Sequence, residues 1–319
     1  MPRVSVLMAH AGAPTFLAAA CRSLESQSYR DFELVVVDDG AALDWDVYLR
    51  TVRFPWRVLS NGGQRGLAHS LNRAARAAAG SLLARMDSDD VSAPSRLELQ
   101  VACLDARPAV AFSGSAVYWL DQTDRRLGRN FPLTDPEDLA IALAVYNQLC
   151  HGSMLMRREA FERLGGYDEA VAVAQDYELW LRALRAGHDF ANVPEPVYGQ
   201  RLHAQSVSSR AARRQSDLAG QLSARESTQG WNARVESWFA AGRQQRLGRS
   251  HERLQLGRLA VLFLAALAST RVKPSVRPLV LRFIPRHVSG AAELLAREVG
   301  WRHDTALKVA HLLRRPRAT

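Results

Sequence analysis

The chain has 319 residues, a length that suits either one large domain with an appendage or two domains. Hydrophobic residues make up 47% and charged residues 23%, which is ordinary for a globular protein with a sizeable core. The three cysteines (Cys21, Cys103 and Cys150) are too few and too scattered for a disulfide framework or a zinc site, so we expect a reducing, cytoplasmic setting.

The net charge of +10 is unevenly distributed. Residues 201–319 contain 22 Lys and Arg against 7 Asp and Glu, whereas residues 1–200 contain 20 against 25. A mildly acidic N-terminal part that holds an acidic motif is typical of a metal-using enzyme. A basic C-terminal part suggests a binding partner with an anionic surface. No helix-turn-helix, zinc-finger or RNA-binding signature is present in the sequence, so we expect a membrane surface rather than nucleic acid as the partner of this tail.

Strand-like and helix-like segments alternate along the first 200 residues. In chain order we expect strand 4–8, helix 14–27, strands 32–37 and 57–59, helix 67–79, strand 81–84, helix 94–105, strand 110–119, helix 136–145, strand 152–156, helices 158–164 and 176–186, and strand 190–197. This alternation predicts βαβ units in a doubly wound, mostly parallel sheet. Arginine-rich helical segments replace the strands from about residue 206, so we expect a catalytic domain over 1–208 and a basic helical region over 209–319.

Two acidic motifs fall where expected strands end. Asp38-Asp39-Gly40 follows the strand 32–37, and Asp87-Ser88-Asp89-Asp90 follows the strand 81–84. Ligands of such sheets bind beyond the carboxyl ends of the strands, so we expect both motifs in one crevice. Carboxylates this close repel each other unless something positive lies beside them. Two carboxylates two residues apart can share a hard divalent cation, which can in turn grip a diphosphate.

These two motifs and four others, in the same order, are similar to those of the inverting family-two glycosyltransferases with the GT-A fold. The matching segments cover roughly residues 3–205 and are 4–8, 32–40, 66–72, 84–90, 165–168 and 175–182. The resemblance implies a Rossmann-like, mostly parallel sheet flanked by helices, with a C-terminal helical extension. It also implies the transfer of a sugar from a nucleoside-diphosphate donor, of UDP or dTDP type, to a hydroxyl acceptor.

The resemblance implies roles on the donor side of the site. Asp39 is expected to accept a hydrogen bond from the nucleotide base, and Asn72 and Arg85 are expected to line the nucleotide-sugar pocket. Asp87 is expected near the ribose and, together with Asp89, as a ligand of Mn²⁺ or Mg²⁺. Oxygen ligands of this kind suit hard cations.

Three further side chains complete the expected site. Asp176 is expected to be the catalytic base that takes the proton of the acceptor hydroxyl, so that one in-line displacement inverts the anomeric carbon. The alternative is that Asp176 is only a helix N-cap. His203 is expected to contact the metal or the diphosphate, with a surface histidine on a loop as the alternative. His151 is expected on the acceptor side, where it would orient the acceptor.

The chain departs from the family pattern at three places. Residues 9–12 (Ala-His-Ala-Gly) replace the usual Pro-Val-Tyr-Asn, and Ala41 replaces the usual Ser, both in the region of base and ribose binding. Gln175 replaces the usual Glu before the expected base and alters its charge neighbourhood. A catalytically inactive nucleotide-sugar-binding subunit of the same fold is therefore the alternative to an enzyme. A nucleotidyltransferase would need a glycine-rich activating loop, of which residues 9–14 are a poor version.

The basic C-terminal region allows two interpretations. Residues 259–268 are strongly apolar, but a lone membrane span needs about 20 residues. Residues 279–284 and 307–315 mix apolar and basic side chains, and helices of this kind can lie in a membrane interface and bind anionic lipids. Peripheral attachment to the inner face of the plasma membrane would suit a saccharide or lipid-linked acceptor in cell-surface polysaccharide or glycolipid assembly. The alternative is a helical cap that packs on the catalytic domain.

Overall fold

The computed structural model describes residues 1–130, 132–145 and 147–203. The described residues 1–143 and 147–203 belong to one compact unit, which holds all the expected site residues. The basic helical region expected over 209–319, with its apolar segments, lies outside the described residues. Within the described ranges, no helix combines the length and the apolar character that crossing a membrane requires.

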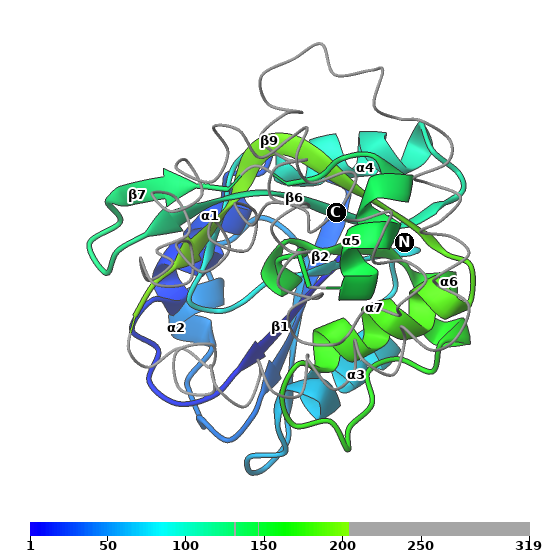
Figure 1. Ribbon diagram of the computed structural model, residues 1–319. Helices are drawn as coiled ribbons and strands as arrows, with labels where there is room; N and C mark the ends of the chain where they lie inside the picture. The colour runs from blue at the N-terminus through cyan, green and yellow to red at the C-terminus, as the bar shows by residue number, and fades with distance from the viewer. Residues whose placement is uncertain (131, 146, 204–319) are drawn as a thin grey trace, which may run out of the picture. The chain divides into compact units, whose positions relative to one another are not determined.

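The N-terminal half of the unit forms the parallel part of a sheet. Its strands β1 (Val4–His10), β2 (Phe32–Asp38), β3 (Trp56–Ser60) and β4 (Leu82–Arg85) lie in the order β3-β2-β1-β4. β1 and β2 are labelled in Figure 1. His10 pairs with Asp38 and Leu7 with Arg85, so the carboxyl ends of β1, β2 and β4 meet at one edge. The expected parallel pairing is confirmed, and it places both acidic motifs at this edge.

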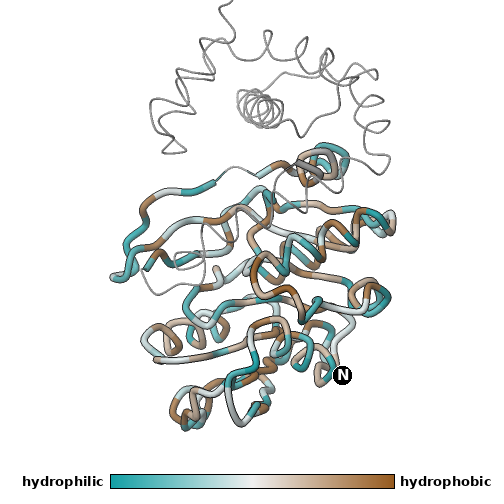
Figure 2. The backbone as a smooth tube through the Cα atoms, turned by 60° about the horizontal axis from the view of Figure 1, so that its bottom comes forward, coloured by the Kyte–Doolittle hydropathy of each residue, from teal (hydrophilic) through white to brown (hydrophobic). Residues whose placement is uncertain are grey.

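Helices cover the two faces of these strands because alternate strand residues point to opposite faces. Val4, Val6 and Met8 lie in a core with Leu17 and Leu24 of the first helix. The helices here are α1 (Leu17–Glu25), α2 (Asp46–Leu49), α3 (Leu67–Ala77) and α4 (Arg96–Asp105), and α3 contacts β1 and β2. Hydrophobic and hydrophilic segments alternate along the helical coils in Figure 2, as expected for helices with one buried side.

The remaining strands make the sheet mixed. β8 (Leu155–Arg157) is antiparallel to β4 and to β6 (Val110–Leu120), and β9 (Asp189–Arg201) is parallel to β6. β5 (Val91–Ser92) and β7 (Arg126–Arg129), which the sequence did not predict, pair with β9 and β6. Pro194 and Pro196 do not end β9; its register with β6 shifts between Val193 and Pro196, where proline cannot donate a ladder hydrogen bond.

The last helices are α5 (Pro136–Val145), η1 (His151–Ser153), α6 (Arg158–Arg163) and α7 (Gln175–Arg185). A strand was expected over 152–156, but η1 is a 3₁₀ turn and the strand begins only at Leu155. Trp180 and Leu184 of α7 are 0% and 3% exposed, so both lie in the core. Arg182 donates to the backbone oxygens of Leu164 and Gly166, so α7 is fixed to the loop that follows α6.

Gly80, which immediately precedes the chain's entry into β4, should not tolerate a side chain. A Cβ at this position would lie 2.7–2.8 Å from backbone atoms of Arg3, Val4 and Ser5, none of which can move aside cheaply. We expect Gly80→Ala to lower the free energy of unfolding by about 1–3 kcal/mol, measured by denaturant titration. Gly63→Ala is the matched control, because a Cβ there meets no atom within 4 Å. Equal stability of the two variants would contradict this packing.

Candidate active site

Three aspartates gather in the turn that follows β4. Asp87, Asp89 and Asp90 each place a carboxylate oxygen within 4.8 Å of the other two. The side chains of Asp87 and Asp89 are 36% and 35% exposed, whereas Asp90 is buried. Burial and the charges of the other two aspartates raise the pKa of Asp90 well above its ordinary value. A cluster of hard oxygen donors has the chemistry to hold a divalent cation.

Tyr198 of β9 holds this acidic turn in place through two hydrogen bonds. Its hydroxyl donates to Asp90 Oδ2 (2.7 Å) and accepts from the backbone N–H of Asp87 (3.1 Å). The backbone N–H of Arg201 donates to Asp90 Oδ1 (2.7 Å). Both oxygens of Asp90 are therefore engaged within the fold, which leaves Asp87 and Asp89 as the better-placed metal ligands.

His203 lies directly beside Asp89, with its Nε2 atom 2.8 Å from Asp89 Oδ2. The neighbouring Arg201 donates through Nε to the backbone oxygen of Asp89 (2.9 Å), which ties the end of β9 to the acidic turn. The structure thus brings together the three residues expected at the metal, Asp87, Asp89 and His203. The expected role of His203 remains a prediction, and its side chain is only 11% exposed.

Arg85 supplies a buried positive charge at the end of β4. Its side chain is 2% exposed and forms an ion pair with Asp87. Burial alone would lower the pKa of Arg85, but the Asp87 carboxylate outweighs burial and the net pKa is raised. The Nε atom of Arg85 is buried without a hydrogen-bond partner among the described residues.

A second buried arginine, Arg96 of α4, holds the backbone around Arg85. Its Nη2 atom donates to the backbone oxygens of Arg85 (2.6 Å) and Gly152 (3.1 Å), and its guanidinium lies 4.8 Å from the Tyr198 ring centroid. Burial lowers the pKa of Arg96 to about 10, which still leaves it charged at neutral pH. Arg96 therefore joins β4, η1 and β9 beneath the site.

Asp176 lies in the first turn of α7, half-buried. It follows Ala174, which adopts the left-handed backbone conformation with φ of +57°, a strained state for a residue with a Cβ. Asn147 Nδ2 donates to Asp176 Oδ2 (2.9 Å). Burial raises the pKa of Asp176, opposed by the Tyr177 backbone N–H, by Asn147 and by the charge of Arg85. The expected base thus shares Arg85 with the acidic turn.

His151 and Tyr167 form a pair next to these charges. His151 Nε2 lies 2.7 Å from Tyr167 Oη. Burial, together with Arg85, lowers the pKa of His151 well below its ordinary value, so this histidine is neutral at physiological pH. Burial raises the pKa of Tyr167, with Asp176 and Asp87 adding to the shift and Arg85 opposing it. The expected acceptor residue therefore lies in the same environment as Asp87 and Asp176.

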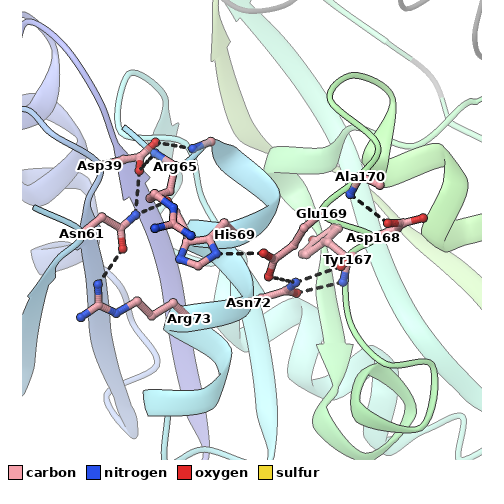
Figure 3. Close-up of polar contacts among 12 residues, drawn as sticks. Asp39, Asn61, Arg65, His69, Asn72, Arg73, Tyr167, Asp168, Glu169 and Ala170 are labelled. Atoms are coloured by element: carbon pink, nitrogen blue, oxygen red, sulfur yellow. Dashed lines mark hydrogen bonds and ion pairs between the residues drawn. The ribbon is translucent and has the colours of Figure 1, made fainter. Parts of the chain in front are cut away.

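Asp39 closes the loop that leads into α3. Its carboxylate is buried and accepts from Asn61 Nδ2 (2.7 Å) and from the backbone N–H groups of Arg65 (2.7 Å) and Gly66 (2.9 Å), as Figure 3 shows. A carboxylate offers about four acceptor positions, so roughly one remains for a nucleotide base. Asp38 instead caps the following turn by accepting from the backbone N–H groups of residues 41–43.

Asn72 clamps the loop between α6 and α7 onto α3. Its Oδ1 accepts the backbone N–H of Tyr167 and its Nδ2 donates to the backbone oxygen of Tyr167, each at 2.9 Å. Nδ2 also lies 3.0 Å from Glu169 Oε1, whose other oxygen meets His69 Nδ1 at 2.8 Å (Figure 3). The amide expected to line the nucleotide-sugar pocket is thus engaged by the protein itself.

His10 gives the unusual segment after β1 a structural role. Its Nδ1 atom lies 2.8 Å from Ser88 Oγ, and its ring packs edge-on against Trp45 at 5.6 Å between centroids. Burial lowers the pKa of His10, which keeps it neutral at physiological pH. The residue that departs from the family pattern therefore connects the end of β1 to the acidic turn.

Comparison with known proteins assigns the chain to a family. The profile of the family described as glycosyl transferase family 2 matches residues 5–165, half of the chain. This chain belongs to glycosyl transferase family 2. The putative glycosyltransferase EpsE of Bacillus subtilis is 32% identical over 206 residues, which cover 62% of this chain and 72% of EpsE. The amylovoran biosynthesis glycosyltransferase AmsE of Erwinia amylovora is 28% identical over 203 residues, covering 62% of this chain and 74% of AmsE.

Solved structures support the GT-A fold of this family 2 glycosyltransferase. The crystal structure of S. aureus TarS 1-349 has a TM-score of 0.58 at 16% identity and covers 94% of this chain and 93% of its own. The same protein in complex with UDP-GlcNAc has a TM-score of 0.59 at 15% identity, with the same coverage. The expected fold is confirmed, and the family establishes glycosyl transfer as the activity class.

Several site residues of this family 2 glycosyltransferase were not predicted from its sequence. Arg96, Asn147 and Tyr198 lie outside the recognised motifs, and Tyr167 lies inside one but had no expected role. A signal was available only for Tyr198, which directly follows the expected last strand 190–197 and lies shortly before His203. The others depend on contacts between segments far apart in the chain.

Asn72→Ala tests whether Asn72 stabilises the fold or lines the donor pocket. Two buried backbone groups of Tyr167 would lose their partner, so we expect the free energy of unfolding to fall by about 2–3 kcal/mol in denaturant titrations. His69→Gln is the control, because it disturbs only the more exposed contact with Glu169 and should cost less than about 1 kcal/mol. Unchanged stability with a raised KM for the donor would instead make Asn72 a pocket residue.

Proposed function

We propose that this chain is an inverting, divalent-metal-dependent hexosyltransferase. It moves a sugar from a UDP- or dTDP-type donor to a hydroxyl group of a saccharide or lipid-linked acceptor. The observation that carries the proposal is the cluster of Asp87, Asp89 and Asp90 carboxylates after β4, beside the buried Arg85 that pairs with Asp87. The charge of Arg85 also opposes the rise in the pKa of Asp176. A donor-binding side and a base side that are both influenced by the buried Arg85 guanidinium are consistent with one active site for sugar transfer.

The donor side is formed by the acidic turn. Asp87, Asp89 and His203 would hold Mn²⁺ or Mg²⁺. The carboxylates of Asp87 and Asp89 lie close together and His203 Nε2 lies 2.8 Å from Asp89 Oδ2, while Asp90 is engaged by Tyr198 and Arg201. When bound, such a cation neutralises charge that develops on the leaving diphosphate. Arg85 contributes a fixed positive charge at the same place.

The nucleotide is proposed to lie along the edge between β2 and β4. Asp39 retains roughly one acceptor position for the base, as its three internal hydrogen bonds imply. Asn72, whose amide is engaged by Tyr167, would act on the nucleotide sugar chiefly by fixing that loop.

On the acceptor side, Asp176 takes the proton of the attacking hydroxyl. The new bond from acceptor oxygen to anomeric carbon forms as the bond from that carbon to the diphosphate oxygen breaks, so the configuration inverts. Burial raises the pKa of Asp176, which strengthens it as a base. Neutral His151, held by Tyr167, is proposed to orient the acceptor hydroxyl.

Relatives support the proposed setting. AmsE is described as an amylovoran biosynthesis glycosyltransferase, and WbnJ of Escherichia coli, 25% identical over 219 residues, as an O-antigen biosynthesis glycosyltransferase. TarS, which shares the fold, has been solved with UDP-GlcNAc. We therefore propose a role in cell-surface polysaccharide or glycolipid assembly, with the catalytic domain over 1–208 and the basic region over 209–319 attached to the anionic inner face of the plasma membrane.

Asp176→Asn tests the proposed base. The amide cannot take a proton, so we expect turnover to fall by about 10²–10⁴-fold while binding of UDP in the presence of Mn²⁺ stays near wild type. Nucleotide release from a panel of sugar donors measures turnover, and calorimetry measures binding. Near-normal turnover would show that Asp176 is not the base. If the wild-type chain itself releases no nucleotide from any donor, a non-catalytic binding subunit becomes the better description.

Asp89→Ala tests the donor side. Removal of a proposed metal ligand should weaken Mn²⁺-dependent UDP binding by tenfold or more, on the order of the loss when a metal site loses a supporting group. Asp105→Ala is the matched control, since Asp105 is similarly exposed but pairs with Arg3 at the surface. Calorimetric titration of UDP with Mn²⁺ or with EDTA compares the variants. Equal affinities for Asp89→Ala and Asp105→Ala would remove Asp89 from the metal site.

A further inference from the structure

Asn147 holds the Asp176 carboxylate through an amide whose orientation is fixed. Asn147 Oδ1 accepts the backbone N–H of Leu149 (3.2 Å). A backbone N–H can only donate, so the amide oxygen must face Leu149 and the amide nitrogen must face Asp176. Nδ2 then donates to Asp176 Oδ2 at 2.9 Å. The contact therefore delivers a hydrogen-bond donor to a carboxylate and favours its ionised form.

We propose that Asn147 is a positioning residue that orients the Asp176 carboxylate for removal of the acceptor proton. The proposal rests on the proposed function, in which Asp176 is the base. Asn147 acts through Asp176 and is not itself proposed to touch substrate. The hydrogen bond restrains rotation of the carboxyl group, which the first turn of α7 places at the site and to which the Tyr177 backbone N–H also points.

The groups that face Asp176 come from several elements. Arg85 acts from the end of β4, and Tyr167 acts from the loop before α7. His151 in η1 is reached through Tyr167 and is neutral at physiological pH. From α7 itself, the Tyr177 backbone N–H points to the carboxylate. Of these groups, Asp176 is the proposed base, so the acid limb of the kcat profile is expected to follow its protonation.

Asn147→Asp is the sharpest test, because it exchanges only the NH₂ group for oxygen. The new carboxylate can still accept the Leu149 N–H, so the local turn is preserved. It also places a negative charge beside Asp176, and two carboxylates this close share a proton, which raises the pKa of the pair. A base with a raised pKa stays protonated to higher pH, so the acid limb of the kcat profile should move to higher pH.

The expected results separate positioning from binding. For Asn147→Asp we expect kcat at neutral pH to fall about tenfold to a hundredfold, the range for losing a hydrogen bond to a charged group, with partial recovery as the pH is raised. KM for the donor and calorimetric UDP–Mn²⁺ affinity should stay within about twofold of wild type. Asn147→Ala removes the same donor without adding charge, so its kcat should also fall, with a smaller shift of the acid limb. Asn147→Ala therefore still tests the proposal if Asn147→Asp does not fold.

Asn130→Asp is the matched control. Asn130 is also half-buried and also accepts a backbone N–H through Oδ1, from Val117 at 2.7 Å. Its conversion should leave the pH profile unchanged. Wild-type kcat and pH profile in a folded Asn147 variant would overturn the proposal. If Asp176→Asn is inactive in the same assay, only the role of Asn147 fails; if Asp176→Asn is active, the proposed base itself fails.

Discussion

A positive charge buried at the end of β4 allows the acidic groups of the site to lie together. Arg85 is 2% exposed, pairs with Asp87 and acts on Asp176 across the site. Taking a guanidinium out of water costs several kcal/mol, and a group of carboxylates withdrawn from water carries a similar penalty. Each set of charges offsets the penalty of the other. The acidic turn and the residue at the start of α7 therefore form one electrostatic unit, although they are far apart in the sequence.

The position of Arg85 depends on backbone contacts below it. Arg96 holds the Arg85 carbonyl oxygen and stacks on Tyr198, and Tyr198 in turn holds the Asp87 N–H and the Asp90 carboxylate. Arg96 and Tyr198 are buried side chains of α4 and β9, not exposed side chains of surface loops. Functional groups keep their geometry when packed elements and a second layer of hydrogen bonds support them. Asp90 thus serves the site best by bracing the turn, while its neighbours remain open to a ligand.

The parallel half of the fold could be predicted because its signals are local. Buried strands such as Phe32–Asp38 alternate with helices, and parallel strands end at one edge, so the meeting of the acidic motifs followed from topology. Arg96 could not be predicted, since an arginine in the first turn of a helix usually faces water; here it is fully buried. Asn147 carries no motif, and its partner Asp176 is 29 residues away. The family resemblance located Asp39 and Asn72 but could not indicate how far their polar atoms are occupied by the fold.

Those occupied atoms connect the two sides of the site through α3. Asp39 fixes the N–H groups at the start of this helix, and Asn72, further along it, fixes both backbone groups of Tyr167 (Figure 3). The hydroxyl of Tyr167 then meets His151 on the acceptor side. Transfer between two bound groups requires them to be held within a few tenths of an ångström. Because one helix carries both anchor points, the spacing between the proposed nucleotide edge and the proposed acceptor side is set by a rigid element instead of by two independent loops.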